Sequence, residues 1–317
     1  MKQLTRYLRT YVSEYYHPGL YLSVALLLVA SIAFNYAVNF ENSIIDSYFG
    51  SWWRWPMYFA TMAFPFLITC VFLHLFGLQT TWWRSKEYWF LFVIGFAIIS
   101  FQRSFSFFDF IVGDMHRYDR LFTLKVIYKA RSILFTTLPL LLFYYFYERK
   151  RDEQRSWYGL NFKPFDFRPY AVLILVVFVG IAIASFLGDL TNYYPRYLRT
   201  GGERFARLHD LPSWIPVLTY ESIYGLGFLG VEFFFRGFLV IGFSRILGGH
   251  AVIAMVGSYV FLHFGKPISE CISSAFGGYL IGILAYYSRH IWGGVVLHVA
   301  LAWFMELFAW LQKVFND

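Results

Sequence analysis

Residues 214–244 read WIPVLTYESIYGLGFLGVEFFFRGFLVIGFS, an apolar stretch that contains three charged side chains, Glu221, Glu232 and Arg236. The stretch exceeds the ~20 residues that a helix needs to cross a bilayer. A charged group in the middle of a span costs ~2.5–3.5 kcal/mol, so each one needs a function or a partner. The stretch therefore predicts a membrane helix with buried charges.

The rest of the chain has the same composition. Of 317 residues, 58% are hydrophobic and 23% aromatic, whereas 15% are charged, against ~25% in a typical soluble domain. Cys70 and Cys271, the two cysteines, both lie in apolar runs. These features exclude a soluble enzyme, a disordered chain and a disulfide-rich secreted scaffold. They predict an all-α, polytopic transmembrane helical bundle of about 8–9 spans. The expected helices cover residues 19–38, 55–77, 88–102, 122–147, 170–188, 214–244, 251–264, 268–288 and 292–312.

Two details concern the ends of these helices. No small-residue cleavage site closes the run 19–38, so we expect a retained first helix rather than a signal peptide. Lys125, Lys129 and Arg131 lie early in the run 122–147. We therefore expect the fourth span to begin near Ser132.

The net charge of +8 comes from basic residues dispersed between the apolar runs. This distribution argues against a nucleic-acid partner. Basic residues gather on the cytoplasmic side of membrane proteins, and they are frequent both before residue 10 and in the loop 148–168. We expect an integral protein of a bacterial plasma membrane, embedded in the lipid bilayer with its N-terminus in the cytoplasm.

Charged and imidazole groups enter the interiors of the apolar segments from about residue 214 onward. We therefore divide the chain into N-terminal helices and loops, 1–213, and a core that carries the chemistry, 214–317. Glu232 and Arg236 are four residues apart, so they share a helical face and can form an ion pair. A purely structural ion pair is the alternative interpretation.

Two histidines lie in the segments that follow. His263 ends the run 251–264, and Glu270 begins the next helix, where the helix dipole favours a carboxylate. His298 lies inside the last run. We expect Glu232, His263 and His298 to face one cavity, with Glu270 as a reserve base. The supporting candidates are Arg236, Lys266, Glu306 and Glu221.

The segments VEFFFRGFL (231–239) and FLHFGKP (261–267), followed by a histidine on a later helix, carry a resemblance. This ordered set resembles the CPBP (Abi, CAAX-protease) family of intramembrane proteases, which includes prenyl-protein endopeptidases. The resemblance covers about residues 214–312. It implies a helical bundle with a membrane-embedded cavity, in which a glutamate and histidines activate a water for peptide hydrolysis. It also implies a candidate zinc site at Glu232, His263 and His298.

The sequence departs from the family pattern at three positions. The family's first motif has two adjacent glutamates, and Val231 replaces the first of them. Ala302 stands where the third motif has an asparagine. Tyr259 stands where the second motif has a phenylalanine, which is a milder change.

Three functions remain open. The first is an active protease of a variant subfamily, with Glu232 or Glu270 as the base and a membrane protein or lipidated peptide as substrate. The second is a catalytically inactive pseudoprotease that binds the same kinds of molecule. The third is a proton-coupled transporter, against which the sequence shows no repeated halves.

Overall fold

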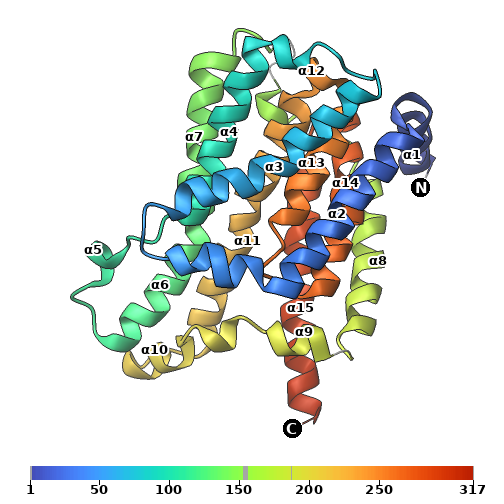
Figure 1. Cartoon of the computed structure of the whole chain (residues 1–317). Coiled ribbons are helices and arrows are strands. Elements are labelled where there is room, and N and C mark those ends of the chain that lie inside the picture. Colours follow the sequence, from blue (N-terminus) through green and yellow to red (C-terminus); the bar gives the residue numbers. More distant parts are fainter. Residues whose placement is uncertain (1, 153–155, 187, 317) are drawn as a thin grey trace.

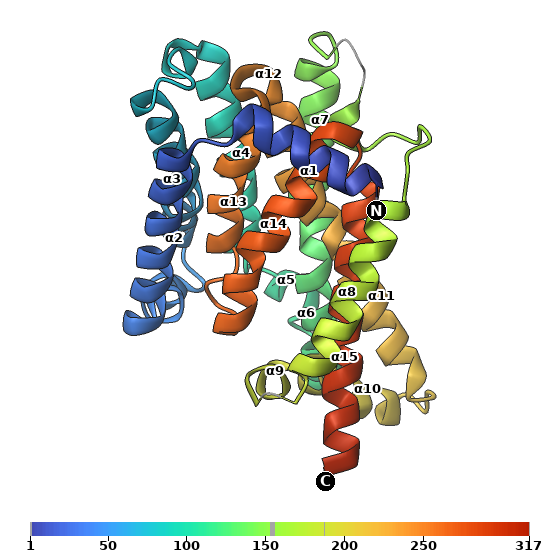
Figure 2. The ribbon, with the colours of Figure 1, turned by 90° about the vertical axis from the view of Figure 1, so that its right-hand side faces the viewer.

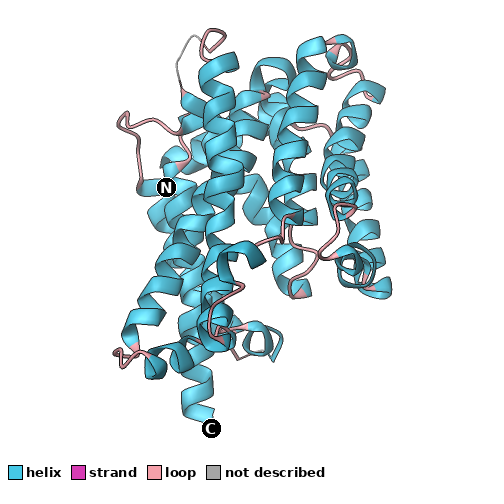
Figure 3. Ribbon diagram, turned by 90° about the vertical axis from the view of Figure 1, so that its left-hand side faces the viewer, coloured by secondary structure: helices cyan, strands magenta, loops and turns pink. Residues whose placement is uncertain are grey.

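Helices make up the regular structure of the computed structural model, which describes residues 2–152, 156–186 and 188–316 (Figures 1 and 3). No strand occurs within those ranges. The long helices form a bundle, and a short N-terminal helix lies across one end of it (Figure 2). The predicted all-α bundle is confirmed.

The helices of the bundle begin and end close to the predicted positions. They are α2 (Pro18–Val38), α3 (Arg54–Leu75), α4 (Lys86–Ser104), α6 (Arg117–Ser132), α7 (Leu138–Phe143), α8 (Arg168–Ala184), α11 (Trp214–Glu232), α13 (Ala251–Phe261), α14 (Ile268–Ser288) and α15 (Trp292–Asn316). Shorter helices at the ends of the bundle are α5 (Asp109–Val112), α9 (Gly188–Tyr193), α10 (Gly202–Leu208) and α12 (Ser244–Leu247).

Seven helical segments of the described chain are long and apolar enough to cross a membrane, or up to eight if the pair Arg168–Ala184 and Gly188–Leu208 counts as one span. One of the seven, Trp214–Phe261, contains 48 residues. A single crossing needs only ~20, and the chain turns back at α12 within this segment (Figure 1). The protein is therefore an integral membrane protein with a span number close to the predicted one.

The fourth span differs from the prediction. It begins at Arg117 rather than near Ser132, and it continues from α6 through α7 to Glu148. Helix α6 packs against α11, and Ser132 Oγ at its C-terminal end donates a hydrogen bond of 2.8 Å to the Gly227 carbonyl. The basic residues of α6 can be helical because α11 packs beside this helix.

The sequence analysis missed helix α1 (Lys2–Tyr15). This helix is too short and polar to span a membrane, but Tyr11 on its inner face is fully buried. The Tyr11 hydroxyl donates a hydrogen bond of 2.9 Å to the Gly249 carbonyl. Helix α1 thus anchors the turn that precedes α13.

The helices before residue 213 pack against those that follow it. Helix α3 packs along α13, and Ser258 Oγ donates a hydrogen bond of 2.7 Å to the Met62 carbonyl. One hydrophobic cluster contains both Phe66 from α3 and Phe234 from the segment after α11. The C-terminal core is therefore folded against the N-terminal helices.

The segment after α11 is a π-helix, η8 (Phe233–Gly242), and all ten of its residues are buried. Its hydrogen bonds join residues i and i+5. This geometry is rare in proteins, and where it occurs it is often at a functional site. Glu232 is the last residue of α11, and Arg236 lies in the first turn of η8. The two predicted charges therefore lie where the helix changes its winding.

Candidate functional site

Glu232 and Arg236 form the predicted ion pair, with 2.8 Å between Glu232 Oε1 and Arg236 Nη1. Both side chains are fully buried. The same carboxylate oxygen lies 2.7 Å from Nδ1 of His298 on α15. The Arg236 guanidinium also lies 4.2 Å from the centre of the Tyr259 ring. A carboxylate is thus held in the bundle by a guanidinium and an imidazole.

The backbone of α15 covers this carboxylate from the other side. A Cβ atom placed on Gly294 would lie 2.0 Å from Glu232 Oε2, so only a glycine permits the approach. Glu232 does not line any of the cavities described below. The expectation that Glu232 faces the same cavity as the two histidines is therefore wrong, because α15 packs directly over its carboxylate.

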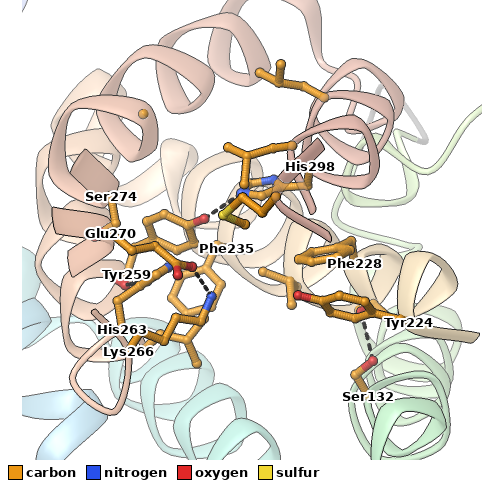
Figure 4. A pocket seen from close by; sticks show the side chains of 18 of the residues that line it. Ser132, Tyr224, Phe228, Phe235, Tyr259, His263, Lys266, Glu270, Ser274 and His298 are labelled. Carbon is orange, nitrogen blue, oxygen red and sulfur yellow. Dashed lines mark hydrogen bonds and ion pairs between the residues drawn. The ribbon is translucent and has the colours of Figure 1, made fainter. Parts of the chain in front are cut away.

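A cavity of about 340 Å³ lies beside this ion pair. One wall carries Tyr259, His263, Lys266 and Glu270 from α13, α14 and the turn between them, whereas α6 and α11 form the opposite wall (Figure 4). His298 projects from α15 between the two walls. The predicted convergence of His263 and His298 on one cavity is confirmed.

Both ring nitrogens of His298 have neighbours. The Tyr259 hydroxyl lies 2.5 Å from Nε2, and Nδ1 faces Glu232 as described. A proton on Nδ1 places positive polarity beside the carboxylate, although the two atoms are not aligned as a hydrogen bond. Nε2 is then left to accept the hydrogen bond from the tyrosine hydroxyl. The imidazole also stacks on Phe228, with 5.6 Å between ring centres. His298 is therefore held in one orientation at the cavity surface.

His263 has a different environment. Its Nδ1 lies 2.8 Å from the Tyr259 carbonyl oxygen, which can only accept a hydrogen bond, so Nδ1 carries the proton and Nε2 keeps a free lone pair. Burial, and then the nearby charge of Lys266, hold the pKa of His263 well below its usual value. His263 is thus neutral and presents an unprotonated nitrogen.

Lys266 and Glu270 form an ion pair on the same wall. Burial alone would lower the pKa of Lys266, but the Glu270 carboxylate outweighs it and raises that pKa. The Tyr194 hydroxyl donates a hydrogen bond of 3.1 Å to the second carboxylate oxygen of Glu270. Glu270, the reserve base, lines the cavity with both oxygens occupied.

Two supporting candidates lie elsewhere. Glu221 and Glu306 line a second cavity of about 830 Å³ between α11 and α15, and neither lines the first. The Glu306 carboxylate accepts hydrogen bonds from the backbone N–H groups of Arg196, at 2.8 Å, and Tyr197, at 3.2 Å. Glu306 therefore fixes the loop before α10 rather than supporting the histidines.

The two positions that depart from the family pattern have different surroundings. Val231 lines the cavity of the histidines. Ala302 is fully buried in a hydrophobic cluster with Tyr220 and Tyr224, and it does not line the cavity. An apolar side chain therefore occupies a cavity position at Val231, whereas Ala302 is a packing residue.

The sequence analysis missed the central position of Tyr259, which contacts both histidines and Arg236. Its spacing of four residues from His263 gave the signal, because i and i+4 share a helical face. Lys129 and Arg131 also line the cavity, which their predicted position before the fourth span did not indicate.

The candidate zinc ligands do not fit a zinc site. No group of three or more histidine, cysteine or acidic side chains is placed to hold a metal ion within the described residues. Glu232 pairs with Arg236, and both nitrogens of His298 face protein groups. A three-ligand site needs free donors around one point, so we derive no chemistry through a metal.

Comparison of the chain with protein families, with curated proteins and with solved structures finds no match.

Proposed function

We propose that this protein is an intramembrane endopeptidase, a variant relative of the CPBP proteases that the motifs resemble. One observation carries the proposal, namely that His263 and His298 line one buried cavity together with the hydroxyl of Tyr259. Hydrolysis inside a bilayer needs a positioned water, a base and a donor for the developing oxyanion. These three side chains can supply the base and the donor.

In the proposed reaction, Nε2 of His263 accepts a proton from a water as the water oxygen attacks the peptide carbonyl. The same proton passes to the amine when the peptide C–N bond breaks, so the imidazole returns to its neutral state. His263 suits the first step because its free nitrogen is already unprotonated. The Tyr259 hydroxyl, which donates to His298 Nε2 in the resting site, turns its one proton to the developing oxyanion as that charge forms.

Glu232 has a positioning role in this proposal. Its carboxylate cannot reach a water in the cavity because α15 covers it. It can fix the tautomer of His298 and stabilise positive charge on that imidazole, as carboxylates do beside histidines in other hydrolases. This assignment replaces the expectation that Glu232 itself is the base.

The substrate class follows from the position of the cavity. The cavity lies among membrane helices, and Val231, Phe228 and Leu297 contribute apolar surface to it. A membrane protein or lipidated peptide that enters from the bilayer suits such a surface. We also propose a bacterial plasma membrane with the N-terminus in the cytoplasm, on the charge distribution given above.

Cleavage of a library of apolar peptides by the purified protein tests this function. We expect wild-type cleavage, and a loss of ~10²–10⁴-fold in His263→Gln. Ser273→Ala is a suitable control, because Ser273 lines the same cavity without contacting either histidine. Full loss in Glu270→Gln with intact cleavage in His263→Gln would transfer the role of base to Glu270.

A pseudoprotease is the second candidate, and the position of Val231 favours it. The family's first glutamate would face this cavity, and an isopropyl group stands there instead. A wild type that cleaves no peptide of the library, combined with a Val231→Glu variant that does, would establish an inactive protein with an otherwise complete site.

A further inference from the structure

Five basic side chains line the cavity of the histidines. They come from four separate parts of the chain: Arg103 on α4, Lys129 and Arg131 on α6, Arg196 after α9, and Lys266 before α14. One carboxylate, Glu270, lines the same cavity. Lys266 and α6 lie on opposite sides of the cavity, and we call the five residues together the basic wall.

Two members of the basic wall have carboxylate partners. Lys266 pairs with Glu270, and Arg103 Nη2 lies 2.6 Å from Glu41 Oε1. The other three members form no ion pair with any carboxylate of the described residues; they are Lys129, Arg131 and Arg196. This leaves three cations without a paired anion.

The direct contacts of these three cations are with neutral groups. The Arg196 guanidinium lies 4.3 Å from the centre of the Tyr193 ring. Lys129 Nζ lies 3.5 Å from the centre of the Tyr224 ring. The Arg131 guanidinium donates a hydrogen bond of 3.2 Å to the Phe105 carbonyl, and its buried Nε has no partner. Each arrangement leaves N–H groups that can donate hydrogen bonds to an anion in the cavity.

Other carboxylates lie near the basic wall but face away from the cavity. Glu221 and Glu306 attract Lys129 at longer range, yet both line the second cavity. The two oxygens of Glu306 already accept backbone hydrogen bonds. Glu221 and Glu306 therefore line the second cavity, whereas the cations of the basic wall line the cavity of the histidines.

The cations also repel one another. Lys129 experiences the positive charges of Arg196 and Lys266, and Arg131 experiences that of Arg103. Unpaired cations among membrane helices are costly, so their presence marks a pathway or a binding site. An anionic ligand in the cavity would remove this repulsion.

We propose that the basic wall binds a carboxylate of the peptide that occupies the cavity. The inference rests on the proposed function and adds a substrate feature to it, namely a negative charge close to the scissile bond. The Lys266 backbone N–H donates a hydrogen bond of 3.1 Å to the His263 carbonyl. One member of the basic wall, Lys266, therefore lies in the same turn as the reacting histidine, and the other four line the same cavity.

The size of the cavity favours a peptide over a lipid. Its volume of about 340 Å³ is at the low end of the range for small-molecule sites. A short peptide segment with one carboxylate suits this space better than a lipid with two acyl chains. The adjacent histidines give the bound group a chemical role, which a lipid headgroup would not need.

Binding of fluorescent tripeptides to the purified protein in zwitterionic detergent tests the proposal. The probes are acetylated Leu-Leu-Phe with a free C-terminal carboxylate, the same peptide as a carboxamide, and carboxamides with Asp or Asn as the middle residue. The first pair tests a terminal carboxylate, and the second tests a side-chain carboxylate. The His263→Gln background keeps binding separate from cleavage.

We expect at least one acidic probe to bind about tenfold or more tightly than its neutral partner, as for a charge-assisted hydrogen bond. Lys129→Met should abolish this difference, whereas Lys129→Arg should retain most of it. Lys125→Met is the matched control, since Lys125 is exposed on the same helix and does not line the cavity.

Equal binding of acidic and neutral probes to the wild type would overturn the proposal. Co-purification of phosphatidylglycerol with the wild type but not with Lys129→Met, without any preference among the peptides, would assign the basic wall to a lipid headgroup and also overturn it. A carboxylate preference without cleavage would sustain the binding site while rejecting the protease. Cleavage without a carboxylate preference would sustain the protease while rejecting the carboxylate-binding site.

Discussion

The Nδ1 atom of His298 lies 2.7 Å from the Oε1 atom of Glu232, which joins the second turn of α15 to the end of α11. Arg236 reaches the same oxygen from η8 at 2.8 Å. Three ionisable groups therefore meet at a carboxylate that α15 covers, and of the three only His298 lines the cavity. The geometry makes Glu232 a link between helices, and it places the reactive surface at the histidines.

We expect Arg236→Ala to lower the thermal stability of the protein strongly. Removal of one partner leaves the Glu232 carboxylate buried without its guanidinium, at a cost of ~3–5 kcal/mol. The melting temperature in detergent, followed by tryptophan fluorescence, measures this loss.

A double variant separates the charge effect from lost packing. Glu232→Met with Arg236→Met removes both charges and fills similar space, so it should recover much of the stability. An unchanged melting temperature in the single variant Arg236→Ala would contradict the buried ion pair.

Gly294→Ala should destabilise the protein, because the new methyl group would lie 2.0 Å from the Glu232 carboxylate. Gly277→Ala on α14 provides the matched control, since no atom lies within 4 Å of its added Cβ. The control should be neutral or stabilising by up to ~1 kcal/mol, as alanine favours a helix. Similar melting temperatures for both variants would mean that α15 does not cover the carboxylate.

Tyr259→Phe should lower peptide cleavage by ~10²-fold, the usual effect of removing an oxyanion donor. Its effect on stability should be about 1 kcal/mol, the net contribution of one hydrogen bond. Tyr21→Phe is the control, because it loses a hydroxyl contact of 2.8 Å with Tyr279 outside the cavity. Equal cleavage by the two variants would remove Tyr259 from the proposed mechanism.

His263 should make the stability of the protein depend on pH. Burial lowers its pKa in the folded state, whereas the unfolded chain titrates near pH 6.5. Below that pH the unfolded state binds more protons, so stability is lost as the pH falls. The melting temperature should therefore decrease from pH 7.5 to pH 5 in the wild type, and less so in His263→Gln. An identical decrease in both would show that other groups cause it.

The fold was largely predictable from composition and apolar runs. The prediction of helix positions failed where contacts with distant segments outweighed the local sequence pattern. Lys125, Lys129 and Arg131 suggested a late start for the fourth span, but α6 is helical from Arg117 because α11 shields part of it. Helix α1 was missed because its burial depends on one side chain, Tyr11, which a hydropathy average does not detect.

The candidate site was predictable as a set of residues but not as a geometry. Spacing gave the Glu232–Arg236 pair, since it depends on one helix alone. Whether Glu232 faces a cavity depends on how closely α15 approaches, and Gly294 decides that from a distant part of the sequence. The basic wall depends on segments from both halves of the chain, so no local pattern could reveal it.

The π-helix η8 has a consequence for how the chain tolerates a change in its length. A segment with i to i+5 hydrogen bonds accommodates more residues per turn than an α-helix does. Deletion of one residue after Arg236, for example Val240, could therefore be absorbed by conversion of the end of η8 to α-helix, with Glu232 and Arg236 still paired. Deletion of one residue from α13 would rotate the residues that follow it by ~100° about the helix axis. This rotation would turn His263 away from the cavity. The protein thus tolerates the deletion of one residue in η8 but not in the neighbouring helix α13.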